Sequence, residues 1–275
     1  MNNEIKIHIM RTGLVKVDKA LPFHGQYRNP IAFTGLFRSE KNQVILPVSS
    51  YLIEHPKGTV LVDTGWGKLI RESNWKELGP QIQINKGYLP AGWAVDERLA
   101  QLGYQPSDLD LVLMSHLHCD HASGLNLVKD AKKILVSSDE WRVANKLPLV
   151  YLPNEWKGVS LETYDFQDLK VGPFGKAYDV FGDGSLLQIY TPGHSSGLAT
   201  TMVRGADNKY VLLAADVGYA NRSWKEMLTP GICVDRKKAI ISLGWMRDMA
   251  EHEDCLVALA NHDTQTKPQT ITLPF

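Results

Sequence analysis

The sequence predicts an α/β fold with layered sheets, and two observations carry this prediction. Early in the chain, residues 48–53 and 59–62 are strand-like, and the His-Pro-Lys-Gly sequence at 55–58 is typical of a turn, which predicts a β-hairpin. Later in the chain, apolar strand-like runs alternate with helical patterns. No repeat, low-complexity tract or Pro/Ser-rich linker interrupts residues 1–275, so we expect a single domain. The pattern alone leaves several α/β folds open.

The predicted strands come from two kinds of apolar pattern. In residues 4–9 polar and apolar side chains alternate, which predicts a strand with one buried face. Residues 109–114 instead form a continuous apolar run, which is typical of a strand buried on both faces. The remaining strand-like runs are 133–136, 186–190, 199–203, 210–214 and 256–259.

Helices are predicted where capping residues accompany amphipathic segments. The segment 95–102 carries its charges on one side and ends at Gly103, a residue type that often terminates helices. The Ser-Asp-Glu sequence at 138–140 is typical of an N-cap with an acidic first turn, and it precedes a helix at 141–146. Asp235 opens a longer helix whose apolar residues recur at helical spacing: Ile240, Leu243, Met246 and Met249.

The composition is that of an ordinary globular protein. Thirty Lys and Arg balance thirty Asp and Glu, which argues against nucleic acid or an anionic membrane as a partner bound by bulk charge. The three cysteines form no C-x-x-C pair, and the first residues lack a signal-peptide pattern. No run approaches the roughly 18 apolar residues of a membrane span. We therefore expect a cytoplasmic protein without a membrane partner.

Four residues of metal-binding type follow the predicted strand at 109–114. They are His116, His118, Asp120 and His121, in the pattern H-x-H-x-D-H. Three imidazoles and a carboxylate suit a divalent ion of the zinc type, and a loop at the end of a rigid strand lets them converge on one point. The set is larger than one tetrahedral ion needs, which indicates two ions.

Three later residues occupy the same kind of position, shortly after an apolar run. His194 follows the run at 186–190, and His262 follows the run at 256–260. Asp216 ends the sequence Val-Leu-Leu-Ala-Ala-Asp. Each residue alone is a weak signal, because a surface histidine or a capping aspartate would give the same pattern. Their shared position makes all three candidate ligands.

These motifs resemble those of the metallo-β-lactamase-fold hydrolases. The resemblance covers nearly the whole chain, because V-L-V-D-T-G at 60–65, the H-x-H-x-D-H loop, T-P-G-H at 191–194, Asp216 and His262 occur in the family's order. It implies an αββα four-layer sandwich, in which two mixed sheets are flanked by helices and the metal site lies at one edge of both sheets.

The resemblance also implies a role for each candidate. One ion would be held by His116, His118 and His194, the second by Asp120, His121 and His262, with Asp216 bridging both and Asp63 orienting the ligands. The expected cofactor is two divalent metal ions per chain. Zinc is the first choice, with manganese, cobalt or iron as alternatives, because such ligands accept several ions.

Within this family the motifs are most similar to those of the N-acyl-homoserine lactone lactonases. That group carries a tyrosine three positions after the bridging aspartate, and here Tyr219 follows Asp216 at this spacing. The sequence departs from the group at Cys119, where an apolar or aromatic residue is common, and at Asn261, where glycine is frequent. We interpret Cys119 as a small space-filling side chain.

A lactonase reaction would give two of these residues catalytic roles. Two ions about 3.5–4 Å apart would lower the pKa of a bridging water towards about 7, and this hydroxide would attack the lactone carbonyl. Asp120 is expected to carry the proton to the leaving oxygen. Tyr219 is expected to donate a hydrogen bond to the oxyanion.

Aromatic side chains are the candidates for the substrate pocket. We expect Phe23, Phe33 and Trp66 near its mouth, although ordinary core packing would explain each of them as well. The expected partner is a small-molecule lactone or ester, with no nucleic acid and no membrane, and a homodimer stays open.

Several other functions remain open on this scaffold. A thioesterase of the hydroxyacylglutathione hydrolase type would share all the ligands, and a persulfide dioxygenase would use a single iron. Tyr219 and an expected helical insertion around 66–95 favour the lactonase. The zero net charge argues against a nucleic-acid-processing enzyme, and the complete ligand set argues against a binding protein with a vestigial site.

Overall fold

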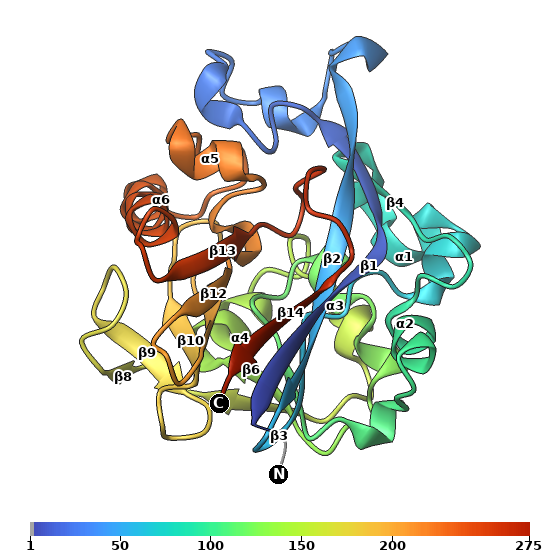
Figure 1. Ribbon diagram of the computed structural model, residues 1–275. Coiled ribbons are helices and arrows are strands. Elements are labelled where there is room, and N and C mark those ends of the chain that lie inside the picture. The colour runs from blue at the N-terminus through green and yellow to red at the C-terminus, as the bar shows by residue number, and fades with distance from the viewer. Residues whose placement is uncertain (1–2) are drawn as a thin grey trace.

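A computed structural model describes residues 3–275 and shows two mixed β-sheets packed face to face (Figure 1). The first sheet has the strand order β14 (Thr270–Pro274), β1 (Glu4–Asp18), β2 (Gln43–His55), β3 (Gly58–Val62), β5 (Leu111–Leu113), β6 (Ile134–Ser137) and β7 (Leu161–Tyr164), with β4 (Asn85–Tyr88) also paired to β1. The neighbouring strands β3, β5, β6 and β7 run parallel to one another. The remaining pairs of this sheet are antiparallel. This sheet therefore places the ends of β3 and β5 side by side.

The second sheet is antiparallel except at one edge. Its order is β13 (Cys255–Leu259), β12 (Tyr210–Leu213), β11 (Ala199–Arg204), β10 (Leu186–Tyr190), β9 (Lys176–Asp179) and β8 (Gln167–Asp168). Only β12 and β13 run parallel, so their carboxyl ends also meet at one edge. The chain segments that follow β10, β12 and β13 all carry candidate ligands.

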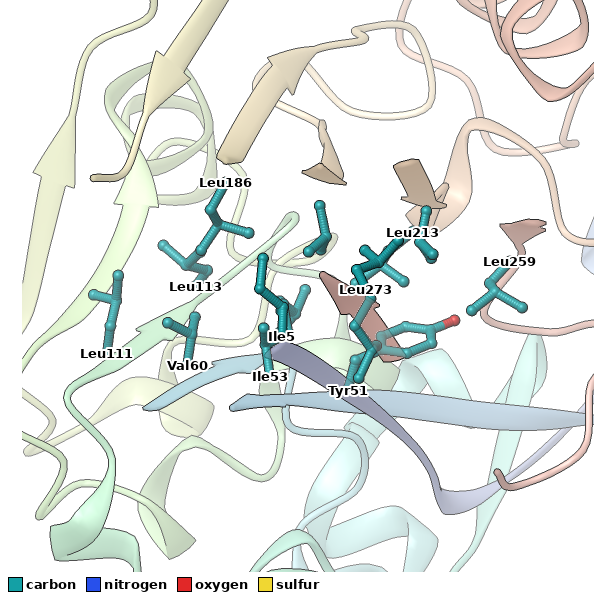
Figure 2. Packing of buried hydrophobic residues seen from close by; sticks show 14 of the residues in the cluster. Ile5, Tyr51, Ile53, Val60, Leu111, Leu113, Leu186, Leu213, Leu259 and Leu273 are labelled. Carbon is teal, nitrogen blue, oxygen red and sulfur yellow. The ribbon is translucent and has the colours of Figure 1, made fainter. Parts of the chain in front are cut away.

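The main core lies between the sheets, where Figure 2 shows leucines of the second sheet facing residues of the first. Alternation within the strands produces this arrangement, because neighbouring side chains point to opposite faces. In β2, Tyr51 and Ile53 point into this core, whereas Leu52 points to the outer face. In β5, Leu113 faces the core and Val112 faces outward.

Helices cover both outer faces, which completes the four layers (Figure 1). The first sheet is covered by α2 (Val95–Gln101) and α4 (Ser138–Ala144), and the second by α5 (Asn221–Lys225) and α6 (Arg236–Ala250). Buried Leu99 of α2 and buried Leu243 of α6 pack onto their sheets. The predicted αββα fold is confirmed. Among residues 3–275, no helix is both long and apolar enough to cross a membrane.

The structure corrects several predicted elements. The N-cap of helix α4 is Ser137, one residue earlier than expected, because its hydroxyl accepts the backbone N–H of Glu140. The helix therefore begins at Ser138. Ile240 of α6 is exposed rather than part of its apolar face. The expected helical insertion at 66–95 contains short helical turns, the five-residue α1 (Asn74–Leu78) and strand β4.

Five strands have no counterpart among the predictions: β4, β7, β8, β9 and β14. These strands are short, and most of their residues are exposed or only partly buried. Such strands lack both the continuous apolar run and the clear alternation by which the other strands were predicted.

Candidate metal centre

The H-x-H-x-D-H sequence lies at the carboxyl end of β5, as expected, and enters the short helix α3 (Cys119–Ala122). Asp63 directly follows β3, the parallel neighbour of β5, and its backbone N–H donates to Leu113 O at 3.0 Å. His118 is the residue before α3, in an extended conformation. The first sheet thus contributes Asp63 and the whole motif to one edge of the sandwich.

The second sheet brings the other three candidate ligands to the same edge. His194, Asp216 and His262 follow β10, β12 and β13, and each side chain is at most 2% exposed. Three groups of potential ligand atoms result, and within each group the atoms lie within 4.8 Å of one another: His116, His118 and His194; His116, His121 and Asp216; Asp120, His121 and His262.

Asp216 lies between the two histidine groups. Its Oδ2 is 3.3 Å from His194 Nε2 and 4.0 Å from His116 Nε2. Its Oδ1 is 3.3 Å from His121 Nε2 and 3.2 Å from His262 Nε2. One carboxylate therefore presents a separate oxygen to each group, which is the arrangement of a ligand shared by two ions.

Hydrogen bonds on the far side of the imidazole rings determine which nitrogen faces the centre. His194 Nδ1 donates to Ile232 O at 2.9 Å, and His262 Nδ1 donates to Pro47 O at 2.8 Å. Because a carbonyl can only accept, Nδ1 carries a proton in both rings and Nε2 faces the centre.

Asp63 does the same for His121. Its Oδ2 lies 2.8 Å from His121 Nδ1, so the proton is on Nδ1 and Nε2 faces Asp216. The carboxylate also accepts from the backbone N–H of Ser115 at 2.8 Å and from its hydroxyl at 2.7 Å. That hydroxyl lies 3.1 Å from His116 Nδ1. Asp63 thus positions two imidazoles, one directly and one through Ser115.

The buried polar atoms fit a pair of bound cations. Among the described residues, Nε2 of His116, His121 and His262 and Oδ1 of Asp216 are buried without a hydrogen-bond partner. Leaving such groups unpaired is costly, and a metal ion is a partner that all of them can share. The donors are nitrogen and oxygen, which suits zinc and several other divalent ions.

The two halves of the centre differ in their electrostatics. Burial, reinforced by the neighbouring histidines, holds the pKa of His116 and of His118 well below the usual value, so both rings are neutral. Burial also opposes charge on His121, but the carboxylates of Asp216, Asp63 and Asp120 outweigh it and raise the pKa of His121. The half of the centre that contains Asp120 therefore attracts positive charge more strongly.

Tyr219 and Asp120 lie where the centre meets a cavity of about 510 Å³. The Tyr219 ring stacks on His262 with the ring centroids 4.7 Å apart. Burial, and then the nearby Asp216 carboxylate, raise the pKa of Tyr219 well above its usual value, so the phenol keeps its proton. The Asp120 side chain is 15% exposed and lies 3.4 Å from His262 Nε2.

The cavity corrects two of the three predicted pocket residues. Phe33 lines it, but Phe23 does not, and its ring lies under the Arg222 guanidinium at 5.3 Å. Trp66 is fully buried, and its indole N–H donates to Leu14 O at 3.0 Å, so it is a core residue. The walls are largely aliphatic and include Val15, Val17, Leu21, Ile84, Leu147, Leu149, Val150 and Ile232.

Sequence reasoning missed two residues that support the centre. The carboxylate of Glu140 accepts the N–H of Leu117, between two ligands, at 3.1 Å, and the N–H of Gly197 at 2.9 Å. The Tyr151 ring stacks on His118 with the ring centroids 5.1 Å apart. A glutamate in the first turn of a helix is expected to cap that helix, so the sequence carries no signal for the role of Glu140.

Comparisons with known proteins agree with this fold and donor set. The profile of the Metallo-beta-lactamase superfamily matches residues 44–261. N-acyl homoserine lactonase AttM of Agrobacterium fabrum is 29% identical over 224 residues, covering 79% of this chain and 82% of the relative. A solved N-acyl homoserine lactone hydrolase with bound N-hexanoyl-L-homoserine has a TM-score of 0.73 at 22% identity, covering 94% of each chain.

A second solved structure has the same fold at lower identity. It is AidC, described as a dizinc quorum-quenching lactonase in complex with a product, with a TM-score of 0.66 at 16% identity, covering 98% of this chain and 94% of that one. Structural similarity at this low sequence identity supports the four-layer fold. Because the family profile covers most of the sequence, and the ligand groups lie at the shared edge of the two sheets, this chain belongs to the metallo-β-lactamase superfamily.

Proposed function

We propose that this chain is a dinuclear metal-dependent hydrolase that opens lactone rings, with N-acyl homoserine lactones as its substrates. The observation that carries the proposal is the position of Asp216, whose two oxygens face two separate groups of histidines. Tyr219 borders the same centre on the side of the cavity. The named relatives with lactonase activity support the choice of substrate class.

The residues divide between two ion positions. His116, His118 and His194 would hold one ion, Asp120, His121 and His262 the other, and Asp216 both. Bound ions of this kind polarise a carbonyl oxygen and make water a nucleophile near neutral pH. The protein supplies fixed lone pairs, because backbone carbonyls and Asp63 hold the outer nitrogens of His194, His262 and His121.

Tyr219 and Asp120 would act on the substrate oxygens. The phenol of Tyr219 keeps its proton, so it can donate a hydrogen bond to the carbonyl oxygen as negative charge develops on it. Asp120 reaches both the centre and the cavity, so its carboxylate can accept a proton near the nucleophile and deliver it to the leaving ring oxygen. Both roles need only groups that already face the cavity.

The aliphatic walls of the cavity would bind the acyl chain. Phe33 comes from the segment before β2, and Leu149 and Ile232 come from two other loops, so three parts of the chain form the pocket. Burial of an alkyl chain contributes roughly 0.8 kcal/mol per methylene group. Longer acyl chains are therefore expected to lower KM until the cavity is filled.

The test is a hydrolysis panel with measured metal content. The protein loaded with zinc should open N-acyl homoserine lactones of short and long acyl chain faster than it cleaves thioesters or a β-lactam. Chelation should abolish turnover, and zinc should restore it. His262→Ala should lower both metal content and activity, whereas His252→Ala, at an exposed histidine paired with Asp254, should change neither.

Two results would overturn the proposal. Fast thioester turnover without lactone turnover would assign a thioesterase instead. A single iron per chain, with no hydrolysis of any member of the panel, would assign an oxidoreductase on the same fold.

A further inference from the structure

A second cavity, of about 430 Å³, lies beside the metal-binding loop and shares no lining residue with the cavity at the metal centre. Two carboxylates line it: Glu77 in α1 and Glu155 in the short helical turn Pro153–Trp156. Ser123, which directly follows α3, and Asn126 also line it. The cavity therefore joins three segments that are far apart in the sequence.

Glu155 is the unusual residue of this cavity. It is only 3% exposed, and both of its carboxylate oxygens are buried without a hydrogen-bond partner among the described residues. A buried ionised carboxylate costs several kcal/mol unless a partner compensates for it. Burial, and then the nearby Glu77, raise the pKa of Glu155 well above its usual value, because the surrounding protein disfavours the charged form.

The neighbouring groups supply further oxygen donors. The Ser123 hydroxyl donates to Glu77 and accepts the backbone N–H of Gly67 at 2.8 Å. The Asn126 amide nitrogen donates to Glu155 O at 3.1 Å, which leaves its side-chain oxygen available. Two carboxylates with hydroxyl and amide oxygens form an all-oxygen donor set, which is the set that hard divalent cations prefer.

Three lysines line the same cavity, and two of them are engaged elsewhere. Lys68 Nζ is 2.6 Å from Asp96, and Lys76 Nζ is 3.7 Å from Glu72. The third, Lys157, is exposed and has no carboxylate within 4 Å among residues 3–275. Neither Glu77 nor Glu155 has an ion-pair partner within that distance in the same part of the chain. The lysines thus leave both carboxylates of the cavity without an ion-pair partner.

We propose that Glu77 and Glu155 form a binding site for a hard divalent cation, calcium or magnesium, separate from the histidine-rich metal centre. The ion compensates the buried charge of Glu155 and joins α1 and the turn at Pro153–Trp156 to the end of α3. Because α3 contains Asp120 and His121, the ion would hold the segment that carries these ligands in place.

The test is direct cation binding to the full chain with its histidine site loaded with zinc. Calcium and magnesium are titrated separately by calorimetry, zinc content is measured before and after, and the thermal midpoint is recorded with and without the cation. We expect saturable uptake of one cation per chain and a higher midpoint with the cation, because a ligand that binds the native state stabilises it. Zinc content should stay unchanged.

Variants locate the site. Glu155→Gln and Glu77→Gln should each weaken binding by at least about tenfold. Lys157→Met should strengthen it, because one like charge is removed from the rim. The matched control is Glu162→Gln in β7, an exposed glutamate paired with Lys133 and outside the cavity, which should bind the cation as the unaltered chain does.

Each outcome decides the proposal. Absence of saturable uptake up to about 10 mM cation, above the weakest range of protein calcium sites, would overturn it. Equal binding by Glu155→Gln and the unaltered chain would also overturn it. If Glu155→Gln fails to fold, Glu77→Gln still decides, because the Glu77 side chain is only partly buried and is the more tolerant position.

Discussion

Replacing Tyr219 by phenylalanine removes one hydroxyl from the edge of the metal centre and little else. The ring is 5% exposed and stacks on His262 with the centroids 4.7 Å apart, and phenylalanine keeps that packing. Loss of one oxyanion donor costs about 2.7–4 kcal/mol in sites that rely on hydrogen bonds alone. Since bound ions would share the charge here, we expect a loss of at least about 1.4 kcal/mol, or tenfold in kcat.

The assay is steady-state lactone hydrolysis with matched metal analysis. We expect Tyr219→Phe to lower kcat while KM and the two ions per chain stay near the values of the unaltered protein, because the donor acts on charge that develops only in the transition state. Tyr88→Phe is the control, since Tyr88 is 42% exposed and lies outside the cavity. Unchanged kcat in Tyr219→Phe, with full metal content, would refute the reasoning.

Three further predictions concern metal affinity, pH and backbone space. Asp63→Asn should lower metal affinity about 10- to 100-fold, because the carboxylate orients the ligands from behind; equal zinc retention during dialysis against a chelator would contradict this. Burial lowers the pKa of His55 to about 4, so its contribution to the free energy of unfolding is present above pH 6.5 and is lost as the pH falls towards 4. In His55→Gln the free energy of unfolding, measured by urea denaturation, should therefore depend less on pH over this range, by up to about 2 kcal/mol. A pH profile parallel to that of the unaltered chain would count against this prediction. Gly193→Ala should lower the free energy of unfolding by roughly 2 kcal/mol or more, because a Cβ there would lie 2.3 Å from the Ala239 backbone. The control Gly103→Ala, where a Cβ would have nothing within 4 Å, should cost only about 1 kcal/mol. Similar denaturation midpoints for the two variants would exclude the steric argument.

The positions of the ligands could be predicted for a local reason, whereas the αββα fold followed from the resemblance to the metallo-β-lactamase-fold hydrolases. A ligand at the end of an apolar strand is visible in a few consecutive residues, as in the run that ends at Asp216. Parallel pairing of β3 with β5 and of β12 with β13 then brings the ends of those strands together. The structure brings all seven predicted ligands to one edge, and the binding of ions to them stays a prediction.

What the sequence could not predict depends on contacts between distant segments. The carbonyls of Pro47 and Ile232 that orient His262 and His194 belong to backbone with no distinctive side chain. Trp66 was expected at the pocket mouth, but its aromatic ring is equally suited to a core, and the hydrogen bond to Leu14 O decides between the two. The edge strand β8 and its neighbour β9 were missed because their polar, short pattern resembles that of a loop.

The division of the ligands between the sheets links metal binding to assembly of the whole chain. Every ligand up to His121 comes from the first half of the sequence, and His194, Asp216 and His262 come from the second. Neither half alone offers a complete set for either ion. If ions bind these residues as proposed, the free energy of their binding would also be free energy of association between the halves. If the chain were cut in a loop between β7 and β10, the two fragments should reassociate far more tightly with zinc than without it.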